Sequence, residues 1–355
     1  MWSKMKIAFV IANLNGGGSE RAVSNLSLAM EKEGHSVSII VLDADNIVYP
    51  FGGEIIDLNI PHSSSLVGQI INIFKRKFAL KSLFNTHQFD GIFTFMESAG
   101  FPSAMASKDV VVSVHENPDK MSKVYKLLYP YLYPKTKKVI ACSKAMEDRL
   151  IDLYGFKNTG TIYNSVDIDL VQQKSKEPIE VTRPYILTVG RLVHVKGFDL
   201  LIEAYANSKA KNKLDLIILG EGELRAELQA LIDKKGLSDK VILKGSVDNP
   251  FAYYANADFY VLSSRNEGFP NILIEALACS CPCIAFDCKT GPNEIINHGE
   301  NGLLVEAESV SGLTNAIDNL EEDEELKKYL INNAKQSVLH LTPQSIAKEW
   351  LKLVS

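Results

Sequence analysis

The chain has 355 residues, of which 46% are hydrophobic and 23% are charged, and its net charge is −5. This length is about twice that of a usual domain, so we expect two domains with separate cores. The acidic balance disfavours nucleic acid as a partner. No stretch approaches the roughly 18 consecutive apolar residues that a membrane-spanning helix needs. The odd number of cysteines, five, indicates reduced thiols in a cytosolic protein.

The beginning of the chain has the pattern of a βαβ unit. The apolar run IAFVIANL leads into glycines and a glutamate, so we expect a first strand there and no signal peptide. Within residues 6–43, this strand is followed by a glycine loop, an amphipathic helix and a second strand. Such a unit implies a parallel sheet with its ligand crevice at the carboxyl ends of the strands. Gly16, Gly17 and Gly18 would let the backbone approach a ligand there. Further strands are predicted at 54–60, 91–96, 110–116 and 139–143.

The same region permits two other interpretations. A nicotinamide-dependent oxidoreductase would carry the G-x-G-x-x-G fingerprint, but its third glycine would fall at position 21, which is Arg21. Asp43 and Asp45 have the D-x-D spacing with which some metal-dependent sugar transferases hold a divalent ion. Two acids in a polar turn after a strand explain this spacing more simply. We therefore expect neither a nicotinamide cofactor nor a metal ion here.

His115 closes the predicted strand VVVSV, next to Glu116 and Asn117. A single histidine is usually a structural hydrogen-bonding group. The end of a strand, however, places this one at the expected crevice, so a structural and a ligand-binding role both fit.

Two segments of the first half combine apolar and basic residues. They are LVGQIINIFKRKFALKSLF at 66–84 and KMSKVYKLLYPYLYPKTKK at 120–138, and the first includes Lys75, Arg76, Lys77 and Lys81. Residues 1–165 carry 18 Lys and Arg against 15 Asp and Glu, whereas the remainder carries 20 against 28. Basic amphipathic helices can lie on the anionic inner face of a membrane. Ordinary sheet-covering helices with a solvated charged edge explain the pattern equally well.

A polar stretch without strong periodicity at 165–183 predicts a linker. A second alternation of strands and helices follows, with strands predicted at 185–190, 214–220, 240–245, 258–264, 282–287 and 302–306. We expect an amino-terminal domain at 1–165, a second domain at 166–340, and a carboxyl-terminal helix at 341–355 that packs back toward the first domain.

The stretch SSRNEGFPNILIEALACSCPCIAFD at 263–287 carries the two acids of greatest interest. Glu267 lies on a loop at the end of a strand, and Glu275 lies one turn into a helix that starts after Pro270. The first N–H groups of that helix, around Asn271 and Ile272, would point into the same crevice. The two carboxylates could bind hydroxyl groups, and the N–H donors beside them could bind an anion. This combination suits a nucleotide sugar.

Two cations follow another predicted strand, YILTVG. Arg191 can bind in a bidentate fashion and Lys196 is a point charge, so together they suit a diphosphate, although solvated surface residues give the same pattern. The cysteines between 279 and 288 lack the paired C-x-x-C spacing of structural zinc, which favours small buried residues over a metal site.

Taken together, these stretches resemble family 4 of the retaining glycosyltransferases. The matching motifs are GGGSER at 16–21, the strand-end His115, YNSVD at 163–167, VGRLVHVKG at 189–197, LGEGELR at 219–225, the Glu-x7-Glu of NEGFPNILIEALA, and GPNEIINHGENGLLV at 291–305. The resemblance implies the α/β GT-B fold, in which two Rossmann-like doubly wound domains face each other across a donor-binding cleft. The first domain would bind the acceptor and the second the nucleotide sugar.

The resemblance also implies roles for individual residues. Arg191 and Lys196 would bind the nucleotide diphosphate, Glu275 the ribose hydroxyls and Glu267 the hydroxyls of the donor sugar. His115 would hydrogen-bond that sugar and join Glu267, Arg191 and Lys196 as the catalytic set. The remaining donor contacts would come from Gly17, Gly18, Val247 at the uracil, and the backbone of Phe269, Pro270, Asn271, Ile272 and Leu273. No metal and no cofactor besides the UDP-sugar substrate is implied.

The amino-terminal GGGSER motif resembles bacterial enzymes of polysaccharide and lipid-linked oligosaccharide assembly. The resemblance therefore implies metal-independent transfer of a hexose or N-acetylhexosamine from a UDP-sugar to a saccharide, with a polyprenyl-diphosphate-linked oligosaccharide as the acceptor. A cytoplasmic enzyme would meet that acceptor at the inner face of the membrane, through the segments at 66–84 and 120–138. Two alternatives stay open at this point: a GT-B epimerase acting on UDP-GlcNAc, and a non-catalytic protein that binds nucleotide sugars.

Overall fold

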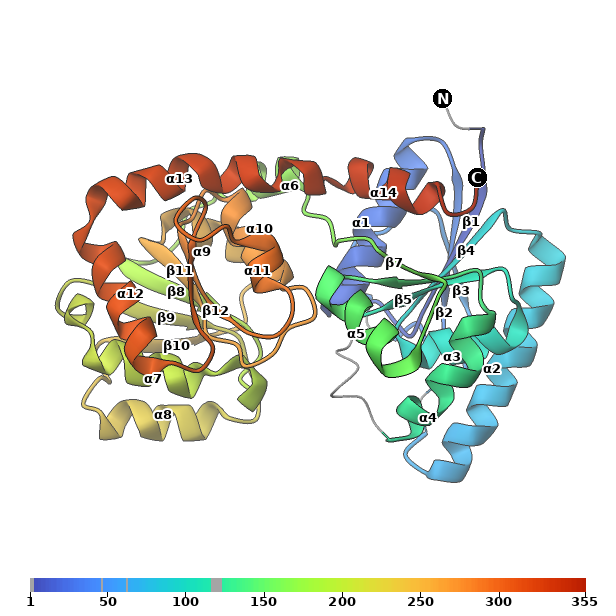
Figure 1. Cartoon of the computed structure of the whole chain (residues 1–355), viewed down its shortest axis with the longest axis horizontal. Coiled ribbons are helices and arrows are strands. Elements are labelled where there is room, and N and C mark those ends of the chain that lie inside the picture. The colour runs from blue at the N-terminus through green and yellow to red at the C-terminus, as the bar shows by residue number, and fades with distance from the viewer. Residues whose placement is uncertain (1–2, 46, 62, 116–122) are drawn as a thin grey trace. The chain divides into compact units, whose positions relative to one another are not determined.

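The structure, a computed structural model, describes the chain except for residues 1–2, 46, 62 and 116–122. The chain divides into two compact units (Figure 1). Unit 1 comprises Met1–Ser165 together with Leu341–Ser355, and unit 2 comprises Val166–His340. Each unit contains a parallel sheet covered by helices, which confirms the predicted succession of two α/β folds.

The sheet of unit 1 has the strand order β3-β2-β1-β4-β5-β6-β7. Its strands are β1 (Lys6–Ile11), β2 (Ser36–Val41), β3 (Glu54–Asp57), β4 (Gly91–Phe95), β5 (Val110–Val114), β6 (Lys138–Ala141) and β7 (Thr159–Thr161). The order reverses between β1 and β4, so the loops after these neighbouring strands share the carboxyl edge of the sheet. The sequence did not predict β7, because its three residues, Thr-Gly-Thr, have no apolar pattern.

Helices cover both faces of this sheet. They are α1 (Gly18–Lys32), α2 (Leu66–His87), α3 (Glu97–Ala106), α4 (Lys123–Leu132), α5 (Lys144–Tyr154) and α14 (Pro343–Leu351), with a short 3₁₀ turn at Tyr133–Lys135. The helix α2 begins where the Ser65 side chain accepts a hydrogen bond from the Gly68 amide at 3.0 Å, a standard amino-terminal cap. No helix in the described part of the chain combines the length and the apolar character needed to cross a membrane.

The last helix, α14, belongs to unit 1 although it follows unit 2 in sequence. It packs against α1, and its Trp350 is 3% exposed. The indole lies 5.1 Å from the ring of Phe93 and 5.3 Å from that of Phe95, measured between centroids. These two rings belong to β4, so the end of the chain completes the core on one face of the unit 1 sheet.

The sheet of unit 2 has the order β10-β9-β8-β11-β12-β13. Its strands are β8 (Tyr185–Val189), β9 (Asp215–Leu219), β10 (Val241–Gly245), β11 (Phe259–Leu262), β12 (Cys283–Asp287) and β13 (Leu303–Glu306). Every residue of the inner strand β9 is buried, as expected for a parallel strand covered on both faces, whereas the edge strand β10 alternates buried and exposed residues. Here the order reverses between β8 and β11, so the loops after these two strands lie side by side.

The helices of unit 2 form two groups. Contacts join α7 (Phe198–Asn207), α8 (Arg225–Lys234) and α12 (Val310–Glu322) in one group, and α6 (Ile168–Lys174), α9 (Pro250–Asn256), α10 (Asn271–Ala278) and α13 (Glu324–Val338) in the other. The short helix α11 (Pro292–Ile295) follows β12, and 3₁₀ turns lie at His194–Lys196, Lys209–Asn212 and Leu339–Leu341.

The predicted linker at 165–183 is wrong in its first part, because α6 lies within it. The Asp167 side chain caps this helix by accepting a hydrogen bond from the Leu170 amide at 3.0 Å. Ile168 and Val171 are buried on one side. Two buried positions in one helical turn are too few to give a periodic signal in the sequence.

We predict that Trp350→Ala destabilises the protein by about 3–5 kcal/mol, because it removes a buried indole from between two rings. Urea unfolding followed by circular dichroism measures this change. Tyr329→Ala on α13 is the control, since Tyr329 is 53% exposed, and its effect should stay within about 0.5 kcal/mol. Equal stability of the two variants would contradict the role of Trp350 in the core.

Candidate active site

The loops after β8 and β11 are joined by an ion pair at the point where the strand order reverses. Lys196 Nζ lies 2.6 Å from Glu267 Oε1, and the side chains are only 18% and 11% exposed. The hydroxyl of Ser264 donates to the same carboxylate oxygen at 2.6 Å. Two residues that the sequence assigned to the site are therefore in direct contact, with opposite charges held partly out of water.

Backbone packing fixes the loop of Lys196 against the loop of Glu267. The Ser263 hydroxyl donates to the carbonyl oxygen of Lys196 at 3.0 Å. Gly197 has φ of +63°, and a Cβ at this position would overlap the carbonyl oxygen of Ser263. Glycine is thus required both by its left-handed backbone and by the close approach of the neighbouring loop.

The helix α10 starts beside this ion pair. Pro270 is its amino-terminal flanking residue and supplies no side-chain hydrogen bond to the first turn. Glu275, one turn further, is 6% exposed. A third loop, which contains Thr290 and Gly291, packs against the same residues. Thr290 Oγ1 donates a hydrogen bond to the carbonyl oxygen of Glu267, and a Cβ on Gly291 would lie 2.7 Å from Pro270 Cδ. The remaining predicted contacts lie at this helix start: Phe269 and Leu273 are buried, and Asn271 and Ile272 are half-buried.

Arg191 and Val247 lie on other loops of the same edge. Arg191 follows β8 and is exposed, and within the described residues no hydrogen bond or ion pair joins its guanidinium to another group. Val247 follows β10, which is separated from β8 by β9, and it is half-buried. Neither residue forms a hydrogen bond or ion pair with Lys196 or Glu267 within the described part of the chain, and their donor contacts stay predictions.

In unit 1 the predicted glycines lie where β1 meets α1. Gly18 begins the helix and Gly17 flanks it with extended backbone. A Cβ on Gly17 would overlap the carboxylate of Glu20, which is buried and accepts a hydrogen bond from Ser19 at 2.8 Å. The contact is with the mobile end of the Glu20 side chain and the backbone of Gly17 is extended, so packing within this loop does not by itself require glycine at position 17.

His115 follows β5 at the same edge of the unit 1 sheet. Its Nε2 lies 2.9 Å from the Ser113 hydroxyl, and its ring lies 5.4 Å from that of Phe95. The ring is half-buried, and its desolvation lowers the pKa of His115 to about 4, so the imidazole is neutral at pH 7. Glu116 and Asn117, expected beside it, lie outside the described residues.

Three further features at this edge were not predicted. Buried Glu97, the first residue of α3, accepts a hydrogen bond from Tyr129 at 2.5 Å. The preceding residue, Met96, has φ of +67°, which is rare for a residue with a side chain. Asn13, after β1, has a buried side-chain oxygen without a hydrogen-bond partner in the described part of the chain. Hydropathy patterns carry no signal for backbone strain or for an unmatched buried atom.

The D-x-D spacing has a structural explanation. The Asp45 amide donates to the Asp43 carboxylate at 3.3 Å, so the first acid stabilises the polar turn that follows β2. Among the described residues, no group of three or more His, Cys, Asp or Glu side chains is arranged to hold a metal ion.

The four clustered cysteines are Cys279, which is half-buried, and Cys281, Cys283 and Cys288, which are buried; all are unpaired thiols. Burial raises the pKa of Cys288 to about 12 and raises the pKa values of the other three thiols well above their ordinary value. These thiols therefore stay protonated and serve as small core residues, as the sequence favoured.

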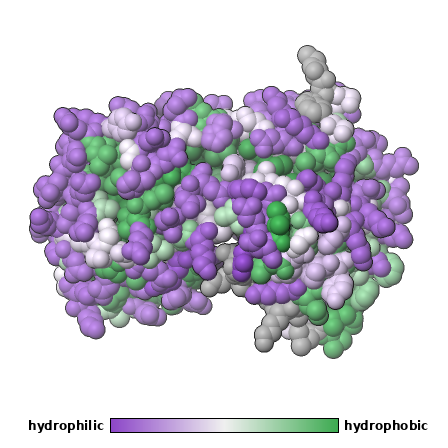
Figure 2. Space-filling view, viewed as in Figure 1, coloured by the Kyte–Doolittle hydropathy of each residue, from purple (hydrophilic) through white to green (hydrophobic). Residues whose placement is uncertain are grey.

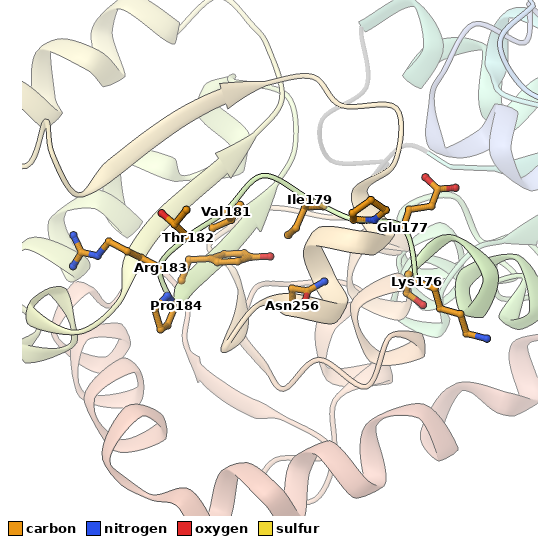
Figure 3. Close-up of a pocket in the computed structure, with 11 residues that line it drawn as sticks. Lys176, Glu177, Ile179, Val181, Thr182, Arg183, Pro184 and Asn256 are labelled. Carbon is orange, nitrogen blue, oxygen red and sulfur yellow. The ribbon is translucent and has the colours of Figure 1, made fainter.

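A cavity of about 670 Å³ in unit 2 lies away from these groups (Figure 3). It is lined by residues 175–185 without Glu180, together with Asn256, and none of the predicted donor-binding residues lines it. Tyr185 is the first residue of β8, so the cavity is at the amino end of that strand, opposite the loops described above. Figure 3 shows the charged ends of Lys176, Glu177 and Arg183 pointing away from its centre. This arrangement does not suit a diphosphate.

Comparison with known families covers nearly the whole chain. Residues 16–170 match the family described as "Glycosyltransferase Family 4", and residues 171–337 match "Glycosyl transferases group 1".

Among curated relatives, the chain is 33% identical to the N-acetylgalactosamine-N,N'-diacetylbacillosaminyl-diphospho-undecaprenol 4-alpha-N-acetylgalactosaminyltransferase of Campylobacter jejuni, and the match covers 98% of both chains. It is 30% identical to a second Campylobacter jejuni enzyme, a GalNAc-alpha-(1->4)-GalNAc-alpha-(1->3)-diNAcBac-PP-undecaprenol alpha-1,4-N-acetyl-D-galactosaminyltransferase, over 99% of this chain and 98% of the relative.

Solved structures share the fold at lower identity. HepE from Anabaena, in complex with UDP and glucose, superimposes with a TM-score of 0.82 at 21% identity over 98% of both chains. The apo form of the lipopolysaccharide outer core galactosyltransferase WaaB gives 0.77 at 20% identity over 99% of both chains. These matches confirm the predicted GT-B class of two Rossmann-like folds. The chain belongs to glycosyltransferase family 4 and is a glycosyltransferase.

Proposed function

We propose that this enzyme transfers a hexose or an N-acetylhexosamine, with retention of configuration, from a UDP-sugar to a polyprenyl-diphosphate-linked oligosaccharide. The names of the two Campylobacter jejuni relatives support the acceptor, since both describe transfer to undecaprenyl-diphosphate glycans. The Anabaena structure, which holds UDP and glucose, supports the donor. We propose further that the reaction needs neither a metal nor a cofactor besides the donor.

The observation that carries the proposal is the Lys196–Glu267 pair at the reversal of the unit 2 sheet. As the glycosidic bond breaks, negative charge gathers on the leaving diphosphate, and a fixed cation stabilises it more in the transition state than in the ground state. Exposed Arg191 can turn to the same phosphates, and the N–H groups at the start of α10 can add to them. We propose that Glu275, in the same helix, binds the ribose hydroxyls.

Glu267 is suited to bind sugar hydroxyls and unsuited to act as a nucleophile. Its Oε1 already accepts hydrogen bonds from Lys196 and from Ser264, both at 2.6 Å. A carboxylate held in this way is less nucleophilic, because its charge is already stabilised. We therefore propose same-face transfer, in which the leaving phosphate accepts the proton of the acceptor hydroxyl as the new glycosidic bond forms.

Lys196→Ala and Glu267→Ala should each lower kcat/KM for the donor about 10²–10³-fold, because each removes a charge-assisted contact to the transition state. UDP release from UDP-GlcNAc, UDP-GalNAc, UDP-glucose and UDP-galactose, with and without an undecaprenyl-diphosphate glycan, measures the effect. Activity in the presence of EDTA should match that without it. Lys213→Ala, which removes an exposed lysine outside the loops of this site, paired with Glu321 at 2.6 Å, is the control and should leave turnover unchanged.

The same assay separates the alternatives. UDP release from UDP-GlcNAc that does not depend on the acceptor would indicate the epimerase, and binding of UDP without turnover of any donor would indicate a non-catalytic protein. Full activity of Lys196→Ala or Glu267→Ala would contradict the assigned site.

We propose that His115 binds the donor sugar as a neutral imidazole. Because its pKa is about 4 in the fold and 6.5 in the unfolded chain, only the unfolded chain gains a proton as the pH falls between these values. The contribution of His115 to stability is therefore complete above pH 6.5 and declines toward pH 4. Urea unfolding at pH 7 and pH 4.5 should show the stability difference between wild type and His115→Gln falling by about 2–3 kcal/mol. A stability difference between wild type and His115→Gln that is the same at both pH values would contradict a neutral, half-buried ring.

We also propose that α2 meets the anionic inner membrane surface. An apolar stripe runs along its exposed side, with Val67 69%, Ile70 57%, Ile71 47%, Phe74 47% and Phe78 63% exposed. These residues recur at helical spacing. Figure 2 shows the hydrophobic patch at the lower right, where α2 begins in Figure 1. Leu127 and Tyr131 of α4, in the segment 120–138, are also exposed, whereas residues 120–122 of that segment lie outside the described residues.

One basic residue of this segment has a structural role instead. Arg76 is 8% exposed and donates from Nε and Nη2 to the carbonyl oxygen of Ile60 at 3.2 and 2.8 Å. It therefore holds the loop before α2 and is not available to lipid headgroups, which corrects the expectation that the whole basic run faces a membrane. Lys75 and Lys81 are exposed and Lys77 is half-buried.

Flotation with vesicles of phosphatidylglycerol and phosphatidylethanolamine tests the membrane proposal. Replacement of Lys75, Lys77 and Lys81 by Gln, or of Phe74 and Phe78 by Ser, should remove most of the bound protein, since each lysine contributes about 1 kcal/mol near an anionic surface. The matched control replaces Lys234, Lys235 and Lys240 of unit 2 by Gln and should bind as wild type. Unchanged flotation of both α2 variants would rule out this helix as the contact.

A further inference from the structure

One arginine binds several segments around the Lys196–Glu267 pair. Arg265 lies two residues before Glu267, and its side chain is 15% exposed. Its Nη1 and Nη2 donate to the two carboxylate oxygens of Asp199 at 2.8 and 2.6 Å. Nη1 also donates to the carbonyl oxygen of His194 at 2.8 Å, and Nε donates to Glu308 at 3.0 Å. All three guanidinium nitrogens are thus engaged, in the bidentate geometry that only arginine provides.

The partners of Arg265 belong to three different segments. His194 begins the turn that ends at Lys196, Asp199 is in the first turn of α7, and Glu308 follows β13. The backbone adds a further bond, from the Arg265 amide to the carbonyl oxygen of Val195 at 2.8 Å. The turn that carries Lys196 is therefore bound by both the side chain and the backbone of one residue of the Glu267 loop.

The charges within this cluster stabilise one another. Partial burial alone would raise the pKa of Asp199, but the hydrogen bonds and positive charge of Arg265 outweigh this effect and lower it. The position of Asp199 at the amino-terminal end of α7 is also favourable for a negative charge. Arg265 and Asp199 therefore stay ionised together throughout the neutral pH range.

We infer that Arg265 is a positioning residue, which holds the turn of Lys196 and the loop of Glu267 in the spacing that donor binding requires. This inference rests on the proposed donor site. When a diphosphate binds, the ammonium group of Lys196 has to move from Glu267 toward the phosphate. The backbone of Lys196 must stay in place while its side chain changes partner. Arg265 supplies that constraint without contacting the donor, and a displacement of about 1 Å at such a site costs up to about 10²-fold in rate.

Calorimetric titration with UDP tests this role. Arg265→Ala should weaken UDP binding about tenfold and lower kcat for the donor, whereas Arg265→Lys, which keeps the charge but loses the bidentate geometry, should recover part of the affinity. Asp199→Ala should weaken UDP binding less than Arg265→Ala, because Arg265 then keeps its bonds to His194 and Glu308, and the double variant should be no weaker than Arg265→Ala alone.

Lys327→Ala is the matched control for a merely structural effect. Lys327 is 9% exposed and bridges Asp258 at 2.9 Å and Glu324 at 3.1 Å, so it also joins two acids. Asp258 precedes β11, whereas Arg265 follows it, so the control lies at the opposite end of the same strand. Thermal unfolding should show a loss of stability for both variants, but only Arg265→Ala should weaken UDP binding.

The possible outcomes are distinct. Failure of the wild type to bind UDP would refute the proposed donor site. Binding by the wild type, lost in Lys196→Ala but kept at full strength in Arg265→Ala, would overturn the positioning role alone. An equal loss of affinity in Lys327→Ala would also overturn it, because general destabilisation would then explain the effect.

Discussion

The ion pair between Lys196 and Glu267 is the interaction on which the candidate site depends. Both groups are largely withdrawn from water, so neither tolerates the loss of its partner unless another charge or hydrogen bond replaces it. A ligand that enters here must offer an anion to the ammonium group and hydroxyl groups to the carboxylate. A nucleotide sugar offers both at adjacent positions, whereas a simple phosphate or a free sugar offers only one. In the proposed function, the pair would therefore bind on both sides of the bond between sugar and diphosphate, which is the bond that such a transferase breaks.

The position of this pair follows from the topology of a parallel sheet. Strands β8 and β11 are neighbours in space but far apart in sequence, because the chain first builds β9 and β10 on one side and then returns to build the other. Two loops that depart in opposite directions leave a gap at the carboxyl edge, and charged side chains fill it. Gly197 and Ser263 then set how closely these loops approach. Unit 1 repeats the reversal between β1 and β4, where Asn13 and the strained backbone of Met96 lie.

The sequence predicted the features that depend on local patterns. Strand ends placed Glu267 and Lys196 on the same edge, and Pro270 located the start of α10 correctly. The sequence missed whatever depends on contacts between distant residues: the binding of Asp199 by Arg265, the burial of Arg76 against Ile60, and the carboxylate of Glu20 below the glycine loop. In a sequence, a charged residue that faces water cannot be told from one that pairs with other side chains. Only the fold decides which side chain becomes its partner. The segments α6 and β7 were missed because they are short.

The buried cysteines have a practical consequence for studies of this enzyme. Thiols react with alkylating reagents as thiolates, and the four thiols between Cys279 and Cys288 are kept protonated by their apolar surroundings. All four flank or belong to β12, and three of them are buried, so they become reactive mainly when this part of unit 2 opens. Alkylation rates at these four positions thus record the opening of unit 2, whereas Cys142 records that of unit 1. A cysteine introduced on an exposed surface would, for the same reason, be labelled almost alone in the native protein.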